Sequence, residues 1–217
     1  MKLLVLCDDV WHPAEVIQKG MAYLEDDTYQ FNFVCDAKDI LTPEMIREYP
    51  VVINCKSNNI NGANTEPWFE EGVTEVMPRD FETYVREGGS FLAIHAANAY
   101  FEGHDDEYIA LVGNHFVSHP PRCEVTVKVS DTNHPIADGV GEFTVRDEHY
   151  EIGGIAKDAK VFLHSVSDKG GTQVAGYTRT IGKGKVCVLT PGHILAVWQN
   201  PEFQKLVRNS IDWCISK

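Results

Sequence analysis

The histidine at position 95 ends an apolar run that begins just after two glycines and precedes two alanines, within the segment Gly88–Asn98. An apolar strand, a sharp turn and small flanking residues are the layout of a nucleophile elbow. Here imidazole stands where a thiol or hydroxyl would normally be. Imidazole is a weak nucleophile for acyl transfer but a good general base, general acid or metal ligand. A core histidine that caps a strand is the alternative, but the carboxyl end of a strand is where open α/β sheets bind ligands.

A second histidine, His193, follows the apolar run at 185–189, and Gly192 beside it allows the backbone to approach a ligand. The alternative is a helix-entry residue without chemistry. Since both histidines follow strands of the predicted sheet, we expect His95 and His193 to face one cleft at its carboxyl edge. We expect His95 to be a partly exposed rim residue. The change His95→Ala should then leave folding nearly intact and cost about 10²–10⁴ in rate.

Charged residues also follow the predicted strand at 142–145, in the segment Arg146–Glu151. This segment offers Asp147, Glu148 and Tyr150, which can supply an acid with a raised pKa or accept a substrate hydroxyl. A solvated charged turn would have the same composition. Because aromatic Tyr150 and the apolar residue after Glu151 suggest that the chain folds inward, we expect one carboxylate in the cleft and the segment as its wall.

Two further histidines, His115 and His119, stand four residues apart in the segment 113–120. On a helix this spacing would put both rings on one face and suit a metal ion. Pro120 instead favours an extended chain, so the spacing alone is weak support for a metal site. The two histidines are either partly solvated loop residues or members of the site.

The first predicted strand is followed by Asp9, Trp11 and His12. In a doubly wound sheet this loop reaches the same edge as the loops described above. We interpret these three residues as candidate substrate contacts, with a solvated loop as the alternative. Asn98, the last residue of the elbow segment, is a further candidate substrate contact.

Length and composition favour one α/β domain over residues 1–217, since 217 residues with 43% hydrophobic content can bury a sizeable core. The formal net charge of −13 argues against binding to nucleic acid or to an anionic membrane surface. The apolar start of the chain is interrupted by Asp8 and Asp9, so it predicts a strand rather than a signal peptide. Six cysteines without paired metal spacing predict free thiols in the cytoplasm.

Hydrophobic runs and turn residues predict the order of the elements. Short, unalternating apolar runs in the first half of the chain are typical of parallel strands covered on both faces. We predict strands at 2–7, 31–35, 51–54, 90–94, 124–129, 142–145, 161–165, 172–177 and 185–189. We predict helices at 13–24, 43–48, 78–86, 105–112 and 201–215, and a long polar loop outside the core at 56–64.

Several segments in this order resemble one known family. They are Gly88-Gly89 through His95-Ala96-Ala97, the loop from Gly113 to Pro120, His134-Pro135-Ile136 with Asp147-Glu148 and Tyr150, and Gly182-Lys183-Gly184-Lys185 leading to Pro191-Gly192-His193 and Trp213. Together they resemble the ThuA-like trehalose-utilisation family over essentially the whole chain. The family's fold is similar to that of class I glutamine amidotransferases.

The resemblance implies a flavodoxin-like three-layer α/β sandwich with a mostly parallel central sheet, in which histidine replaces the amidotransferase cysteine at the elbow. It implies carbohydrate metabolism, with a sugar as substrate that a partner dehydrogenase can oxidise to a 3-keto form. The catalytic residues carried over by motif position are His95, His119, Glu148 and His193.

The leading hypothesis is therefore an enzyme that hydrolyses or isomerises a sugar or 3-keto-sugar. A carbonyl at carbon 3 acidifies the neighbouring C–H, so a base can abstract that proton and an acid can protonate the enolate or leaving oxygen. His95 and His193 would share these roles, with Glu148 orienting a ring or binding a hydroxyl. The alternative is a non-catalytic sugar-binding or regulatory module. Amidotransferase activity is disfavoured because no cysteine occupies the elbow.

A metal ion is the remaining open question about cofactors. Imidazoles from His95, His119 or His193 with the carboxylate of Glu148 would suit zinc or manganese and leave an open position. The same residues work as acid and base without a metal. Since the loop at 56–64 contains no histidine, the sequence favours the metal-free form.

Overall fold

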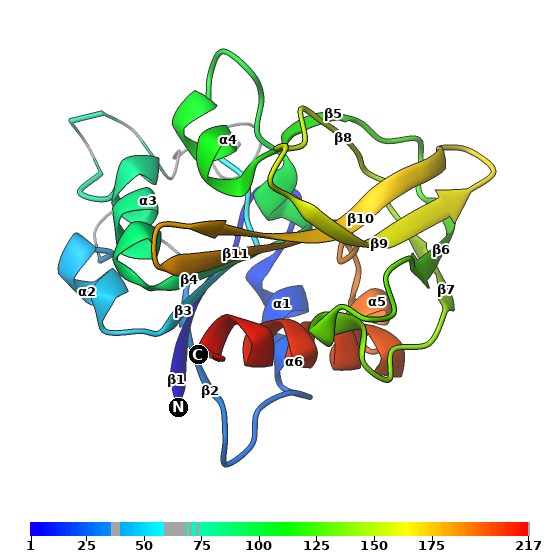
Figure 1. Ribbon diagram of the computed structural model, residues 1–217, viewed down its shortest axis with the longest axis horizontal. Helices are drawn as coiled ribbons and strands as arrows, with labels where there is room; N and C mark the ends of the chain where they lie inside the picture. The colour runs from blue at the N-terminus through cyan, green and yellow to red at the C-terminus, as the bar shows by residue number, and fades with distance from the viewer. Residues whose placement is uncertain (36–39, 59–68, 70, 73, 217) are drawn as a thin grey trace.

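The computed structural model describes residues 1–35, 40–58, 69, 71, 72 and 74–216. Within these residues, nine strands form one mixed sheet in the order β2-β1-β3-β4-β11-β10-β9-β6-β7, and two short strands, β5 and β8, pair separately. Figure 1 shows this sheet between two layers of helices. The predicted α/β sandwich is confirmed.

The strands of the large sheet are β1 (Lys2–Leu6), β2 (Gln30–Val34), β3 (Val51–Asn54), β4 (Ser90–Ile94), β6 (Cys123–Val129), β7 (Phe143–Asp147), β9 (Lys160–Ser167), β10 (Gly171–Ile181) and β11 (Gly184–Leu189). The helices are α1 (Ala14–Met21), α2 (Pro43–Arg47), α3 (Pro78–Glu87), α4 (Asp106–Val112), α5 (Leu195–Trp198) and α6 (Pro201–Ile215), with 3-10 turns η1 (His95–Asn98) and η2 (Pro135–Ala137).

Five strands make the parallel half of the sheet, in the order β2-β1-β3-β4-β11. Counted along this half, the order is 2-1-3-4-5, which is that of flavodoxin-like sheets. The central strands β3 and β4 are buried along their whole length, as their mostly apolar sequences predict. The remaining strands, β10, β9, β6 and β7, extend the sheet with antiparallel pairs.

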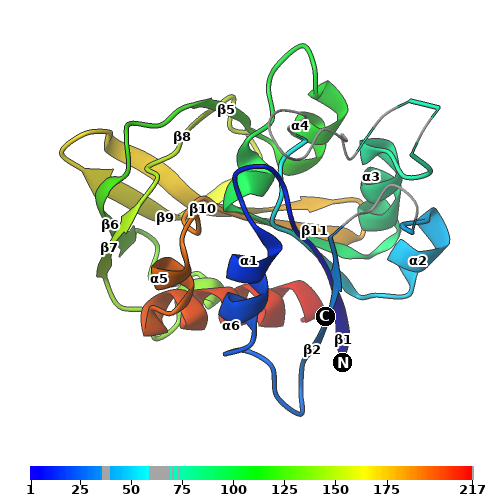
Figure 2. The ribbon, with the colours of Figure 1, turned by 180° about the vertical axis from the view of Figure 1, so that it is seen from behind.

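Helices cover both faces of the sheet (Figure 2). One apolar cluster joins the sheet to α1, α5 and α6, and a second joins it to α2, α3 and α4. The helix boundaries follow local chemistry. Asn200 accepts hydrogen bonds from the first backbone N–H groups of α6, and Pro201 occupies its first turn. Gly88 ends α3 with a φ of 125°, a conformation that glycine adopts without strain.

The small second sheet was not predicted. Strand β5 (His115–Ser118) lies within the predicted loop at 113–120, and it pairs antiparallel with β8 (Glu151–Gly153). Both strands are short and come from distant parts of the sequence, so neither carries a recognisable periodicity of its own. Their pairing matters for the site because His119 directly follows β5, and Glu148 and Tyr150 directly precede β8.

The loop predicted at 56–64 is only partly described, since residues 59–64 lie outside the described part of the chain. Lys56 and Ser57 are each 3% exposed, so the expectation that the whole loop lies outside the core is wrong for these two residues. They are buried because this edge of the sheet is covered by the loops that form the site.

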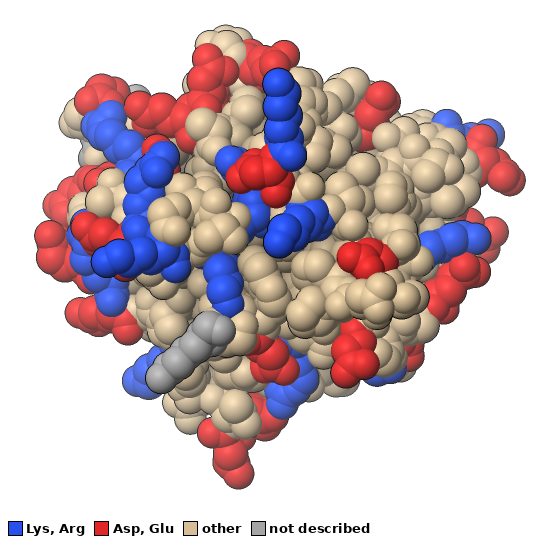
Figure 3. All heavy atoms as spheres, in the orientation of Figure 1, with Lys and Arg blue, Asp and Glu red and all other residues tan. Residues whose placement is uncertain are grey.

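Charged side chains of both signs are interspersed on the face of the molecule seen in Figure 3, most densely over the end that carries α2 and α3. Among the described residues, no helix is long and apolar enough to span a bilayer.

Candidate active site

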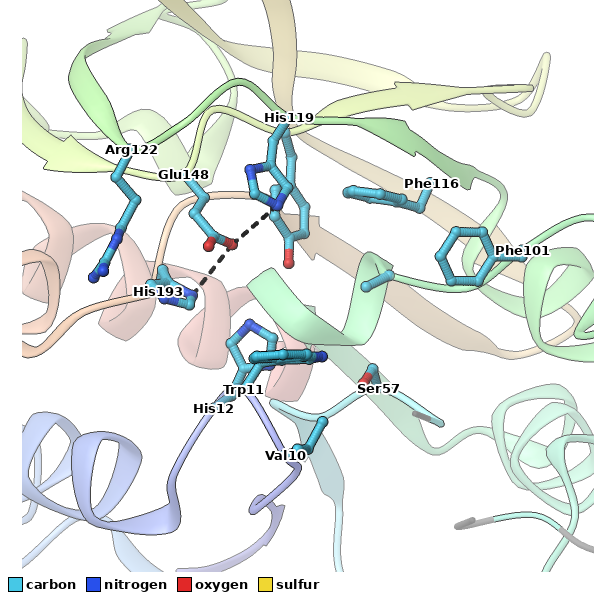
Figure 4. A pocket seen from close by; sticks show the side chains of 12 residues that line it. Val10, Trp11, His12, Ser57, Phe101, Phe116, His119, Arg122, Glu148 and His193 are labelled. Atoms are coloured by element: carbon cyan, nitrogen blue, oxygen red, sulfur yellow. Dashed lines mark ion pairs between the residues drawn. The ribbon is translucent and has the colours of Figure 1, made fainter. Parts of the chain in front are cut away.

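Loops that follow four neighbouring strands meet at the carboxyl edge of the parallel half-sheet. Asp9 and His12 follow β1, Ser57 follows β3, His95 follows β4 and His193 follows β11. In a sheet of this order, ligands bind where the order of the strands reverses, between β1 and β3. Glu148 follows β7 of the antiparallel half, and His119 follows β5 of the small second sheet. Figure 4 shows His12, Ser57, His119, Glu148 and His193 around one pocket.

His95 occupies an elbow of the predicted kind. Its φ is +47°, one of two positive values among described residues other than glycine, and the chain turns at once into η1. Gly192 lies against it, where a Cβ would stand only 3.2 Å from the Cβ of His95. Histidine is thus held in a backbone conformation that costs energy, as residues at functional sites often are.

The His95 ring is buried, with the residue only 2% exposed. The expectation of a partly exposed rim residue is therefore wrong. Its Nδ1 lies 2.8 Å from the carbonyl oxygen of Thr190, and its ring stacks at 4.2 Å between centroids on Tyr150. Because a carbonyl oxygen can only accept, Nδ1 carries a proton and Nε2 is the nitrogen that faces the site.

Three side chains meet at that nitrogen. His95 Nε2 lies 3.3 Å from His193 Nδ1 and 3.6 Å from Glu148 Oε2, and His193 Nδ1 lies 3.2 Å from the same carboxylate oxygen. His119 approaches this oxygen from the other side, with Nε2 at 3.7 Å. His95 and His193 thus approach each other as expected, but only His193 lines the pocket. Glu148 is the carboxylate expected in the cleft.

His12 belongs to the same cluster, which its position alone did not indicate. Its ring centroid lies 5.0 Å from those of both His95 and His193. Its Nδ1 is 2.7 Å from Asp9 Oδ1, while its Nε2 is buried and has no hydrogen-bond partner among the described residues. His12 thus directs an unsatisfied nitrogen toward the two strand-end histidines.

Two carboxylates that were predicted to contact substrate instead support the histidines. Asp9 is 5% exposed and accepts hydrogen bonds from the backbone N–H groups of Trp11, His12 and Ser57. Asp147 is 1% exposed, and its two oxygens accept the N–H groups of Gly192 at 2.9 Å and His193 at 3.0 Å. Neither carboxylate lines the pocket, and Asp147 fixes the backbone that carries His193.

Asn98 and His115 also lie away from the pocket lining. Asn98 is buried and donates hydrogen bonds to the carbonyl oxygens of His95 and Leu189, so it holds the elbow turn against the end of β11. His115 lies in β5 opposite Gly153, with Nδ1 3.2 Å from Glu102 Oε1.

Two effects act in opposite directions on the pKa values of Glu148 and His95: burial, and the attraction between the carboxylates and the imidazoles. Burial alone would raise the pKa of Glu148, but the hydrogen bond and charge of His95 and the charges of His193 and His119 lower that pKa to about 2. Burial lowers the pKa of His95, but Glu148 and Asp147 outweigh it, so the net pKa is raised.

The remaining groups behave differently. Burial and the charge of His95 lower the pKa of His193 to about 4, despite the attraction of Glu148. Burial raises the pKa of Asp9, but hydrogen bonds from His12, Ser57 and Trp11 bring that pKa down to about 2. For Asp147, burial prevails and the pKa is raised. Glu148 and Asp9 are therefore carboxylates at neutral pH, and His193 is a neutral ring.

The pocket in front of this cluster has a volume of about 620 Å³, within the range of small-molecule sites. Trp11 and Phe101, which are 59% and 50% exposed, stand at its mouth. Figure 4 shows His119, Glu148 and His193 on one side and the aromatic rings of Phe101 and Phe116 on another. The lining residues are Val10, Trp11, His12, Ser57, Ala99, Phe101, Phe116, His119, Arg122, Glu148, Tyr150 and His193.

The sequence analysis missed six of these lining residues: Val10, Ser57, Ala99, Phe101, Phe116 and Arg122. Val10 and Ser57 follow strands of the parallel half-sheet, so their place at strand ends was the available signal. The others depend on the small second sheet and on the turn after η1, which the sequence did not predict.

A family model described as trehalose utilisation, ThuA, matches residues 4–214. The chain belongs to the ThuA family. Its fold is similar to that of a putative ThuA-like protein from Bacteroides uniformis, with a TM-score of 0.77 and 19% identity over 100% of this chain and 92% of that one. A putative ThuA-like protein from Parabacteroides merdae gives a TM-score of 0.74 and 17% identity, over 98% of this chain and 88% of the other.

A cytoplasmic protein from Salmonella typhimurium is similar over 99% of both chains, with a TM-score of 0.71 and 12% identity. At these identities the likeness shows a shared fold and no more. A comparison with curated proteins found no match. Membership of the ThuA family confirms the expected family and gives the protein a role in carbohydrate metabolism.

Proposed function

We propose that this ThuA-family protein is an enzyme that hydrolyses or isomerises a sugar or 3-keto-sugar by acid–base chemistry. The observation that carries the proposal is the sharing of one carboxylate by two pocket-lining imidazoles. Glu148 Oε2 lies 3.2 Å from His193 Nδ1 and 3.7 Å from His119 Nε2. Acids and bases that contact one another beside a pocket can exchange protons with a bound substrate.

The chemistry we propose begins next to a carbonyl. A keto group at carbon 3 of a sugar acidifies the C–H bonds at the adjacent carbons, and a base removes one of these protons to leave an enolate. Return of a proton at another position isomerises the sugar, whereas protonation of a leaving oxygen releases an alcohol, after which water completes a hydrolysis. Glu148 and His193 are suited to the base role and His119 to the acid role.

His95 takes a different part from the one its sequence position indicated. Because its ring is buried and does not line the pocket, we propose that it acts on the substrate through Glu148 and His193. Its Nε2 lies within 3.6 Å of both partners, so it fixes their orientation and the charge beside them.

The proposed substrate is a small carbohydrate. Exposed aromatic rings such as Trp11 and Phe101 offer flat apolar surfaces for the C–H faces of a sugar, while Arg122 offers donors for its oxygens. The family's link to trehalose utilisation supports the same substrate class. We propose that a separate sugar dehydrogenase supplies the 3-keto form, since the chemistry above needs a carbonyl that an ordinary glycoside lacks.

Deuterium exchange tests the proposal most directly. The full chain is incubated in deuterium oxide with 3-keto-trehalose and with a simple methyl 3-keto-glucoside, and mass spectrometry follows both product formation and deuterium uptake. We expect enzyme-dependent uptake next to the carbonyl, because base removal of that proton precedes either outcome. Glu148→Gln should slow it by about 10²–10⁴, the usual cost of losing a general base.

Glu142→Gln is the matched control, since Glu142 is exposed, pairs with Lys128 and lies outside the pocket. It should exchange at the normal rate. Calorimetric binding of these sugars without any exchange or turnover would overturn the enzymatic proposal. That result would favour a non-catalytic sugar-binding or regulatory module on an amidotransferase-like fold.

A further inference from the structure

Three side chains that line the pocket, and the buried ring of His95 behind them, place potential ligand atoms close together. We propose that His12, His95, His193 and Glu148 together bind one divalent transition-metal ion. These residues offer three ring nitrogens and one carboxylate oxygen that all lie within 4.8 Å of one another. The site is that of the proposed function, and any part of the ion in catalysis rests on that function, whereas binding of the ion does not.

The distances within the cluster suit such an ion. Zinc binds ring nitrogens and carboxylate oxygens at about 2.0–2.2 Å, so two ligand atoms of a tetrahedral site lie roughly 3.3 Å apart. The three distances among His95 Nε2, His193 Nδ1 and Glu148 Oε2 are 3.3, 3.2 and 3.6 Å. The atom offered by His12 lies within 4.8 Å of the others, so a small movement of its ring completes the set.

The outer hydrogen bonds of two histidines fix which nitrogen faces the cluster. The carboxylate of Asp9 is the acceptor in each of its hydrogen bonds. Its Oδ1 accepts from the backbone N–H groups of Trp11 and His12 and also contacts His12 Nδ1. That Nδ1 must therefore donate, as must His95 Nδ1 to the Thr190 carbonyl oxygen. In their neutral forms both rings then turn a lone pair at Nε2 inward.

This pattern is how proteins prepare histidine ligands. A metal-binding imidazole usually donates its other N–H to a carboxylate or a backbone carbonyl, which sets the tautomer and the ring orientation. Here His12 has the carboxylate and His95 has the carbonyl. The buried Nε2 of His12 has no hydrogen-bond partner in the described chain, and a buried polar atom without a partner is rare unless a ligand supplies one.

The types of ligand atom also indicate which metal ion the site favours. Three imidazoles and one carboxylate favour zinc, while manganese prefers more oxygen ligands and binds a given site more weakly. His119 is not part of the set, since its ring nitrogens are not among the ligand atoms that lie within 4.8 Å of one another and its ring is partly exposed. The fourth ligand, His12, comes from the loop after β1 and not from the loop after β3, where the sequence contains no histidine.

A zinc ion held by these four ligands would polarise a sugar oxygen or a water molecule only by taking it as a fifth ligand. His119 would then remain free to move protons, because it lines the pocket without belonging to the ligand set.

Metal binding is tested on the full chain without an affinity tag and without sugar. Elemental analysis of the purified protein is followed by chelation, dialysis and calorimetric titration with zinc chloride and then manganese chloride. We expect one equivalent of zinc per chain, bound more tightly than manganese. Cobalt chloride should give the visible absorption bands of a four- or five-coordinate site.

Variants assign the ligands. We expect His12→Asn to weaken zinc binding at least about 100-fold. Loss of a residue that only hydrogen-bonds to a metal ligand costs up to about 100-fold in affinity, and loss of a ligand itself should cost no less. His119→Asn is the matched control, because it removes an imidazole beside Glu148 that is outside the ligand set, and it should bind zinc within about threefold of the wild type. Circular dichroism confirms that each variant is folded.

Two results would overturn the inference. One is the absence of a stoichiometric ion together with no saturable zinc or cobalt binding, which would mean that protons alone neutralise the cluster. The other is a folded His12→Asn variant with unchanged zinc affinity. Neither result bears on deuterium exchange. A protein that binds no zinc but still exchanges deuterium would refute the metal site and leave the proposed enzymatic function standing.

Discussion

Removing the ring of His95 should destabilise the protein, contrary to what its sequence position indicates. The change His95→Ala removes a hydrogen bond to the Thr190 carbonyl oxygen, worth about 1 kcal/mol net. It also leaves a cavity where the ring packs against Tyr150, at about 2 kcal/mol, the lower end for truncating a buried side chain. The total of about 3 kcal/mol corresponds to a fall in Tm of roughly 6–12 °C for a chain of this size.

A second variant measures the energetic cost of the backbone conformation at position 95 separately from the loss of the side chain. Glycine adopts the φ of +47° freely, whereas an L-residue there is strained by about 1–2 kcal/mol. The extra flexibility of unfolded glycine offsets about 0.5–1 kcal/mol of this relief. His95→Gly should therefore be at least as stable as His95→Ala, by up to about 1.5 kcal/mol, although alanine is normally the more stable of the two.

The assay is urea unfolding followed by circular dichroism, with a chelator present so that bound ions do not contribute. Wild type, His95→Ala and His95→Gly are compared at one pH. An alanine variant as stable as the wild type would refute the packing argument. An alanine variant clearly more stable than the glycine variant would refute the argument from backbone strain.

Two further predictions concern buried polar groups. Asp147→Asn should lower the free energy of unfolding by about 1.5–3 kcal/mol, since the amide has only one acceptor oxygen and one of the two buried backbone N–H groups loses its acceptor; urea unfolding measures this. His134 should be neutral in the fold, because burial lowers its pKa, its Nδ1 accepts from the backbone N–H of Ile136 and its Nε2 can donate to Thr178. The stability that His134 adds should be present above the unfolded pKa of about 6.5 and fall as the pH drops below it. The difference in free energy of unfolding between the wild type and His134→Asn should therefore shrink from about pH 7.5 to about pH 5.

The parallel half of the sheet could be predicted because its strands are continuous apolar runs bounded by turn residues. For example, β3 and β4 were predicted at 51–54 and 90–94, where the structure has them. The pairing of β5 with β8 could not be predicted in this way. Each strand has only three or four residues, and its stability comes from a partner more than thirty residues away.

Within the site, strand ends predicted which loops meet but not which side chains face the pocket. Asp9 and Glu148 both follow strands and both carry a carboxylate. Asp9 is saturated by donors from its own loop and from Ser57, whereas Glu148 contacts three imidazoles from three other loops. This difference depends on contacts between distant segments, which spacing along the sequence does not encode.

The strained backbone at His95 and the buried carboxylate of Asp147 serve the same end. An L-residue stays at a φ of +47° only if its surroundings hold it there, and Asn98, Gly192 and Thr190 all contact this turn. Asp147 in turn anchors Gly192 and His193 through two hydrogen bonds to backbone N–H groups. Backbone strain is thus accepted to keep the His95 and His193 nitrogens 3.3 Å apart beside Glu148, a separation that either a proton on one ring or a shared cation stabilises.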